Sequence, residues 1–454
     1  MVAALSAAGV SLAGCSSSVG SGSSPVADGK VASESATVTT PPPPGGFITD
    51  FVKYIHGNGG AADTSLPAVK IGWASNDSGG SVQSIGPEAT EAAQVTVDWI
   101  NKYGGGIDGH PLVLDKCIVL NAEEEGLGCA QKFLNDPAVS VISYGALSVG
   151  AATIDSTVNG RKPIVIGFSV NASDISTPNT YELFGAGQFS LYPVGEFAKS
   201  FMHAKSCAII YPSSAGTILQ ADGTRLACQA AGIPATIVPF QSTSSDLTSV
   251  LTAAGATKPG AAVIPLVTSP ANCLAAAKNI AQLGVKPTQV VWYTQCQQPS
   301  IKSQYPGGDY PTYYSSISQS ADALVNTPTG QAYTQALGKF GHASNAGDDW
   351  YSGMFGQIMT IAQFMNKVGY AKLSPAAVSE QVSTWRGPLL MGGPVIQCGK
   401  YRFAPGSCQD GNYFLRYLGA GKWARVSQWV EPPAALVASL KRRAAGSGFP
   451  TKWP

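Results

Sequence analysis

The residue types that perform catalysis occur in this 454-residue sequence, but they are not spaced for it. No serine stands in the G-x-S-x-G turn of a hydrolase, and no Gly-Lys pair precedes a serine or threonine as in a phosphate-binding loop. Residues 104–109 match G-x-G-x-x-G, but they follow an expected helix and precede an expected strand, the wrong order for dinucleotide binding. The four histidines are scattered without metal-ligand spacing. We therefore expect a binding protein rather than an enzyme, with no metal and no cofactor.

The nine cysteines indicate disulfide chemistry rather than catalysis. Eight of them fall into close-spaced pairs, namely Cys117 and Cys129, Cys207 and Cys228, Cys273 and Cys296, and Cys398 and Cys408. An even number of cysteines in an exported chain predicts disulfide bonds, although a sequence does not fix their connectivity. Sequential pairing is the simplest arrangement, because each pair brackets about one strand–helix unit.

The ninth cysteine ends an apolar run of small residues that extends from Val2 to Ala13. The order Leu12-Ala13-Gly14-Cys15 is similar to the lipobox of bacterial lipoproteins, in which the cysteine is lipidated and becomes the first residue. The basic region that normally precedes a signal core is missing, which leaves a start upstream of Met1 open. We expect a signal peptide over residues 1–15 and lipid attachment at Cys15.

A tether is expected over residues 16–66, which are rich in serine, glycine and proline. Such a composition cannot bury a core and favours an extended chain. The stretch Phe47–His56 is an exception, because its aromatic residues could mark one short helix docked on the body. Charged residues make up only 12% of the sequence and the formal net charge is +1, which favours neither nucleic-acid binding nor electrostatic docking on a membrane.

The body begins with a strand–loop–helix–strand unit over Val69–Leu114. An apolar run from Val69 is followed by a polar loop over Ser75–Ser84, and Gly86-Pro87-Glu88 has the proline and acidic residue typical of a helix start. Ligands of parallel α/β sheets bind beyond the carboxyl ends of the strands. We therefore expect this loop to form one wall of a binding site.

Strands and helices alternate through most of the remaining chain, which predicts mostly parallel sheets with right-handed crossovers. The length is too great for one core, so two lobes are expected. An exception to the alternation is a pair of strands at Tyr413–Tyr417 and Trp423–Trp429, joined by Gly419-Ala420-Gly421 as a hairpin.

These motifs, taken in order, resemble the leucine/isoleucine/valine-binding protein family, the type I periplasmic substrate-binding proteins of ABC importers. The resemblance covers Val69 to Val430. It rests on the first unit with its G-G-I-x-G-x-x-L turn, on the Cys117 and Cys129 pair, on the runs FLNDPAVSVISYGALS and KPIVIGFSVNASDIS, and on the hairpin near Trp429.

The resemblance implies an α/β fold of two Rossmann-like lobes joined by three crossovers, with a ligand held in the cleft between them. Lobe 1 would comprise residues 67–188 and 321–395, and lobe 2 residues 189–320 and 396–432, followed by a C-terminal tail over 433–454. The implied function is that of an extracytoplasmic, lipid-anchored monomer. It captures a small polar solute, which is an amino acid, an amide or a related compound, and delivers it to an ABC permease in the membrane. The alternative is a ligand-sensing module for a membrane signalling partner.

The resemblance also implies individual site residues. Ser148 takes the place of a serine that binds a ligand carboxylate, and it equally suits a helix N-cap without a ligand. Ser169, Val170 and Asn171 match a second wall, where Asn171 would replace a threonine or serve only in a turn.

Other positions depart from the family pattern. Ile85 falls near an aromatic residue that covers the ligand, and Ser269 lies where an aromatic residue often occurs. Gln295 aligns with the acid that pairs the amino group of an amino acid, and an amide cannot neutralise a buried ammonium group. Either Asp77 or Asp174 supplies that charge, or the ligand is a neutral polar solute, an amide or a carboxylate without an amine.

Overall fold

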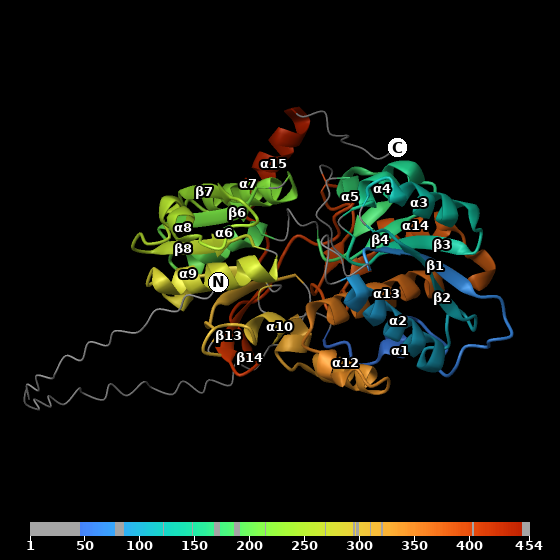
Figure 1. Ribbon diagram of the computed structural model, residues 1–454. Coiled ribbons are helices and arrows are strands. Elements are labelled where there is room, and N and C mark those ends of the chain that lie inside the picture. The colour runs from blue at the N-terminus through green and yellow to red at the C-terminus, as the bar shows by residue number, and fades with distance from the viewer. Residues whose placement is uncertain are drawn as a thin grey trace, which may run out of the picture. The chain divides into compact units, whose positions relative to one another are not determined.

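The computed structural model of the chain describes residues 46–77, 86–120, 122–147, 149–167, 173–185, 191–213, 215–267, 269–293, 296, 299–308, 310–318, 321–401 and 404–446. Within these ranges, no helix combines the length and the apolar character needed to cross a membrane. Figure 1 shows two groups of strands, each covered by its own helices, which correspond to the two expected lobes.

The sheet of lobe 1 has five parallel strands in the order β2-β1-β3-β4-β5. Their bounds are β1 Val69–Ser75, β2 Leu112–Ile118, β3 Val139–Tyr144, β4 Ile164–Ile166 and β5 Thr180–Glu182. The strands β3 and β4 are buried along their whole length. Both faces of these strands are buried because helices cover both faces of a parallel sheet.

Lobe 1 takes helices from two separate parts of the sequence. These are α2 Gly86–Tyr103, α3 Glu125–Asn135, α4 Ala151–Val158 and α5 Ser173–Ser176, and later α12 Pro328–Gly338, α13 Asp349–Val368 and α14 Pro375–Ser383. Every residue of α13 from Asp349 to Met365 is buried. Asp348 caps this helix by accepting hydrogen bonds from the N–H groups of Trp350 and Tyr351, at 2.8 and 3.2 Å. The helix α13 is thus the centre of the lobe 1 core, although it follows lobe 2 in the sequence.

The glycine turn predicted after α2 is present, and its backbone explains the residue type. Gly106 has a φ of +66°, and a Cβ atom there would lie 2.0 Å from the carbonyl oxygen of His110. No other residue fits this position. The turn leads the chain directly from α2 into β2.

Lobe 2 combines a parallel sheet with an antiparallel hairpin. The orders are β7-β6-β8 and β14-β13-β10-β9, and a parallel bridge between Val263 and Val290 connects the two sets. The bounds are β6 Ser206–Pro212, β7 Ala235–Phe240, β8 Ala261–Pro265, β9 Val291–Tyr293, β10 Tyr314–Ile317, β13 Tyr413–Gly419 and β14 Lys422–Arg425. The antiparallel pairing of β13 with β14 confirms the predicted hairpin. The two-lobed α/β fold inferred from the sequence is therefore confirmed.

The helices of lobe 2 are α6 Tyr192–Ser200, α7 Ala215–Ala230, α8 Thr248–Ala254, α9 Pro270–Gln282 and α10 Pro299–Lys302, and α11 Ala321–Leu324 follows β10. The expected C-terminal tail contains a further helix, α15 Ala434–Gly446, which no sequence pattern predicted. Leu436 of α15 is fully buried against α7, in a cluster with Ala227. Part of the tail thus belongs to the packed body.

The last part of the expected tether is also packed. The short helix α1 Phe51–Tyr54 lies within the stretch for which a docked helix was considered. The Phe51 ring meets Trp99 of α2 and Phe355 of α13 edge to face, at centroid distances of 5.9 and 5.2 Å. The chain therefore joins the body well before β1, on the α2 and α13 side of lobe 1.

The disulfide bonds join the eight cysteines in the sequential pairs, which confirms the simplest connectivity. Cys15, the proposed lipid site, lies outside the described residues. The pair Cys398 and Cys408 flanks a segment that follows the small antiparallel pair β11 Arg386–Gly387 and β12 Ile396–Gln397. This segment leads into β13, and so carries the chain back to lobe 2.

Candidate functional site

The carboxyl ends of the lobe 1 strands are the expected ligand wall, and most predicted site residues fall in the gaps between described ranges. Those outside the described residues are Ile85, Ser148, Ser169, Val170, Asn171 and Gln295. Asp77 and Ser269 are described. The described residues that flank these gaps show how the ends of the strands are held in place.

Asn76 is the principal positioning residue at this edge. It is fully buried directly after β1, and its Nδ2 donates to the carbonyl oxygen of Val119 at 2.9 Å and to that of Val149 at 3.4 Å. Its own backbone N–H donates to Ala146 O at 2.9 Å. The side chain of Asn76 thus connects the ends of β1 and β2 with the start of α4, while its backbone binds the chain before position 148.

Asp77 is bound to the first turns of α2. Its Oδ1 accepts a hydrogen bond of 2.8 Å from the Thr90 hydroxyl. That hydroxyl in turn accepts a hydrogen bond of 2.9 Å from the indole N–H of Trp73. The Trp73 side chain is fully buried. This series of bonds holds the carboxylate at the end of β1, where the sequence suggested it as a partner for a ligand ammonium group.

Gln357 of α13 connects the core helix to the end of β3. Its Nε2 donates to Ser143 Oγ at 2.6 Å and to the carbonyl oxygen of Tyr144 at 2.9 Å. Its Oε1 would lie 2.5 Å from a Cβ atom at Gly167, so a larger residue there would displace the Gln357 side chain. Gly167 is the last described residue before the gap that contains the second predicted wall. Gln357 therefore positions the chain where that wall begins.

The helix N-terminus expected to attract an anion is already occupied by a side chain of the protein. The Glu123 carboxylate accepts hydrogen bonds from Gly150 N–H at 2.7 Å and Thr153 N–H at 2.8 Å. These two groups are among the donors that the first turn of α4 leaves without an intrahelical partner. A ligand carboxylate at Ser148 would therefore share this end of α4 with a negative charge.

Asp174, the second candidate partner for an ammonium group, lies inside lobe 1. Its carboxyl group is fully buried and hydrogen-bonds to Asp155 of α4. Asp155 also accepts a hydrogen bond of 2.8 Å from the Tyr144 hydroxyl. Burial raises the pKa of the Asp155 carboxyl above its ordinary value. Two buried carboxyl groups in contact favour a shared proton over two charges, so Asp174 serves a structural network in this arrangement.

Two polar residues of lobe 2 have defined contacts, namely Ser269, which the sequence suggested, and Lys302. Ser269 caps α9 because its hydroxyl accepts a hydrogen bond of 3.2 Å from Asn272 N–H, so this hydroxyl has a structural role. Lys302 ends α10, with its Nζ 4.2 Å from the centroid of the Tyr417 ring. Burial lowers the Lys302 pKa to about 8, while the charge of Asp349 in α13 acts in the opposite direction.

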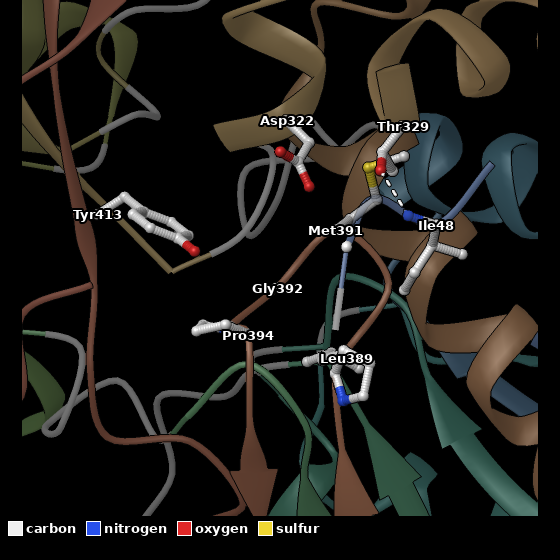
Figure 2. Close-up of a pocket in the computed structure, with 11 residues that line it drawn as sticks. Ile48, Asp322, Thr329, Leu389, Met391, Gly392, Pro394 and Tyr413 are labelled. Atoms are coloured by element: carbon white, nitrogen blue, oxygen red, sulfur yellow. Dashed lines mark hydrogen bonds between the residues drawn. The ribbon is translucent and has the colours of Figure 1, made fainter. Parts of the chain in front are cut away.

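A separate pocket lies among the segments that join the lobes. Figure 2 shows Asp322 and Tyr413 entering it from one side and Ile48, Met391 and Leu389 lining the other. Its enclosed volume is about 10 Å³, which is room for about one water molecule. It is therefore too small to hold an amino acid or a similar solute.

Asn76, Gln357 and Glu123 were missed as site residues by reasoning from the sequence. The only available signal was for Asn76, which follows an apolar run at the end of a strand; the other two act on residues far away in the chain. Among the described residues, no group of three or more histidine, cysteine or acidic side chains is arranged as a metal site. The observed polar groups bond to the ends of the strands and to the start of α4, and so hold these segments in place.

Comparisons with known proteins agree on the family. The family model described as "Periplasmic binding protein" matches residues 68–400, more than half of the chain. No curated protein matches the chain in sequence.

Three solved structures illustrate the similarity of fold. A fatty acid ABC transporter substrate-binding protein from Thermomonospora curvata has a TM-score of 0.64 at 14% identity, over 84% of this chain and 96% of the other. A leucine-binding protein from Thermotoga maritima has a TM-score of 0.63 at 12% identity, over 81% and 99%. A solute-binding protein of an ABC transporter from R. palustris, in complex with benzoate, has a TM-score of 0.60 at 14% identity, over 81% and 97%. The matched model and the two-lobed α/β fold together establish that this chain belongs to the periplasmic binding protein family.

Proposed function

We propose that this chain is the lipid-anchored solute-binding component of an ABC importer, which captures a small polar solute between its lobes outside the cytoplasm. The observation that carries this proposal is the wall built by Asn76 at the carboxyl edge of the lobe 1 sheet, in a chain of this family. Strand ends and a helix start held by one buried amide form a preorganised surface for hydrogen bonds to a ligand. No covalent chemistry is part of the proposal, and we expect bound solute to be released unchanged.

Two observations bear on the class of solute, and they favour different ligands. The structural neighbours described above bind, by their titles, a fatty acid, leucine or benzoate, and each of these has a carboxyl group on an apolar body. In this chain Glu123 already occupies the start of α4, and the family resemblance aligns Gln295 with an acid. We therefore propose a solute without an ammonium group, with an amide or other neutral polar end preferred over a carboxylate.

A thermal-shift screen with matched compounds tests the solute class. The protein is the full chain with Cys15→Ser, so that α1 remains docked, and the pairs are benzoate and benzamide, isovalerate and isovaleramide, and leucine and leucinamide. A ligand at a hundredfold excess over its dissociation constant stabilises the fold by about 2.7 kcal/mol. We expect an amide without an amine to raise the melting temperature most. A stronger response to leucine would contradict the proposed absence of an ammonium partner.

Two asparagines provide a matched test of the binding wall. Asn76→Leu removes the bonds to Val119 and Val149, whereas Asn101→Leu removes bonds to Leu112 of 2.8 and 2.7 Å at the opposite end of β2. Both variants lose a bridging amide in lobe 1. We expect the response to solute to disappear only in Asn76→Leu. An equal response in both variants would place the binding site elsewhere.

The lipid anchor and the transport role need separate experiments in cells. The anchor rests on Cys15 and on the packed entry of the chain at α1, and Cys15→Ser should move the protein from the membrane fraction to the soluble fraction. Loss of the gene should abolish uptake of the identified solute. Retained uptake, with a lost transcriptional response to the solute, would instead identify the alternative function as a sensing module for a membrane partner.

A further inference from the structure

Gln409 lies on one of the segments that run between the lobes, and its side chain bonds to two others and to the loop before β12. Its Nε2 donates to the carbonyl oxygen of Phe184 at 3.3 Å and to that of Ser318 at 2.8 Å, and its Oε1 accepts 2.7 Å from Gly393 N–H. Phe184 follows β5 of lobe 1, Ser318 follows β10 of lobe 2, and Gly393 precedes β12. Gln409 is itself 3% exposed. One buried amide thus holds together chain segments that are distant in sequence.

Two glycines allow this close approach. A Cβ atom at Gly185 would lie 2.7 Å from the carbonyl oxygen of Gln409, and one at Gly393 would lie 2.9 Å from its Oε1. Gly185 also has a φ of +87°, a conformation that other residues adopt only with strain. At Gly185 the backbone is therefore shaped around Gln409, whereas at Gly393 the nearest atoms belong to the Trp429 ring.

The residues on either side of Gln409 are bound to different lobes. Before it, Cys408 N–H donates to Glu182 O of β5 in lobe 1 at 2.9 Å. After it, Asn412 exchanges backbone hydrogen bonds of 2.9 Å with Val430, and its Nδ2 donates to Ser316 Oγ of β10 at 2.6 Å. The change from one lobe to the other therefore occurs between residues 408 and 412, with Gln409 at its start.

We propose that Gln409 is a positioning residue that fixes the three segments at one angle between the lobes and thereby sets the equilibrium between their open and closed arrangements. A rotation that separates the segments would leave buried carbonyl and N–H groups without partners, which costs free energy. The apparent affinity of a ligand depends on the fraction of molecules in the binding-competent arrangement. The inference rests on the proposed function, because only a protein that closes on its solute would use such control.

Distance measurements on the unliganded protein test this role independently of the solute. The full chain with Cys15→Ser carries ketone-bearing amino acids at Gln131 of α3 and Ala253 of α8, both exposed, and each is coupled to a spin label. This labelling leaves the disulfide bonds intact. Double electron–electron resonance then gives the distribution of distances between the two lobes.

The decisive variant is Gln409→Met, which keeps the side-chain length and removes all three hydrogen bonds. The matched control is Gln363→Met. Gln363 is a buried glutamine of α13, and it donates a hydrogen bond of 2.5 Å to the carbonyl oxygen of Tyr54 within lobe 1. We expect a broader or shifted distribution for Gln409→Met only. If Gln409→Met does not fold, Gln409→Glu is measured in its place, since it keeps the acceptor for Gly393 and loses both donated bonds.

Either of two results would overturn the proposal: a Gln409 variant with the wild-type distribution, or equal broadening in the Gln363 control. Because no ligand is added, a failed solute screen does not affect this result. Conversely, an unchanged distribution for the Gln409 variant would leave the solute-binding function intact and remove only the role of this residue.

Discussion

The hydroxyl group of Tyr54 accepts a hydrogen bond of 3.1 Å from the backbone N–H of Leu390, which lies 336 residues further along the chain. The same hydroxyl lies 2.9 Å from Thr360 Oγ1 of α13. Burial raises the Tyr54 pKa to about 12. The helix α1 is thus fastened to two later segments of lobe 1 through one buried oxygen atom.

Tyr54→Phe should lower the free energy of unfolding, because it leaves the Leu390 N–H buried without an acceptor. The expected loss is about 1–3 kcal/mol, measured by urea unfolding. The control is Tyr370→Phe, in which the ring that stacks on His110 at a centroid distance of 3.3 Å is retained. This control should change stability by less than about 0.5 kcal/mol. Equal losses in the two variants would show that the Tyr54 hydroxyl contributes nothing specific.

Lys302→Met should make the protein more stable at neutral pH. The Lys302 pKa is about 8 in the folded protein, below the ordinary lysine value of 10.5, because burial penalises its charge. Between these values the unfolded chain binds more protons, so the free energy of unfolding of the wild type rises as the pH increases from about 8 to 10.5. The advantage of Lys302→Met should therefore be largest below pH 8 and fade towards pH 10.5.

Lys339→Met is the matched control for Lys302. The Lys339 Nζ lies 4.0 Å from the centroid of the Tyr103 ring, but this residue is exposed. The control should show neither the gain at neutral pH nor its loss at higher pH when unfolding is followed in urea. A gain in both variants would assign the effect to removal of any lysine charge.

Asp155→Asn should reduce the dependence of stability on pH in the acidic range. Burial raises the Asp155 pKa above its ordinary value of 3.8, so the folded protein holds the proton more tightly than the unfolded chain. The wild type therefore loses stability as the pH rises from about 3.8 through the raised pKa. Each unit of pKa difference corresponds to about 1.4 kcal/mol.

The measurement for Asp155 is urea unfolding from acidic to neutral pH, compared with Asp98→Asn. Asp98 is exposed on α2, where it accepts 3.0 Å from Gln94 Nε2. Asparagine at position 155 can still accept the hydrogen bond from Tyr144, so packing is retained. A pH profile of Asp155→Asn that parallels the wild type would contradict the buried proton shared with Asp174.

Glu123→Gln should loosen the first turn of α4. The carboxylate accepts two backbone hydrogen bonds there, and an amide has a single acceptor oxygen and no charge. We expect a loss of about 1 kcal/mol and faster hydrogen exchange at Gly150 and Thr153. The neighbouring exposed acid provides the control, because Glu124 makes no side-chain cap to α3. Faster exchange in Glu124→Gln as well would indicate a general effect of charge.

The regular part of the fold could be predicted from the sequence because its signals are local. The helix α2 begins at Gly86, where proline and glutamate indicate a helix start, and β3 is a buried apolar run. By contrast, β5 has only three residues, too few for a periodic pattern. The helix α15 follows two prolines and was predicted as part of the tail. It was missed because only the contact with α7 explains its apolar face.

The site was predictable only where a polar residue follows a recognisable strand. Asp77 was named in this way and lies at the end of β1, whereas residues 78–84 of the polar loop lie outside the described residues. Gln409 was not, because its partners Phe184 and Ser318 are 225 and 91 residues away and no local pattern marks it. Glu123 was not found either, because it bonds to the start of α4, 27 residues away in the chain.

The place of α13 in the sequence has a consequence for how the chain reaches its folded state on export. Lobe 1 cannot complete its core until residues 349–365 have emerged, whereas the strands β6–β10 of lobe 2 are all available earlier. Contacts between distant segments form late, because closing long loops is slow. Three of the disulfide bonds span only 12, 21 and 23 residues and lie entirely before α13. These bonds can therefore stabilise local strand–helix units before α13 is available to complete the core of lobe 1.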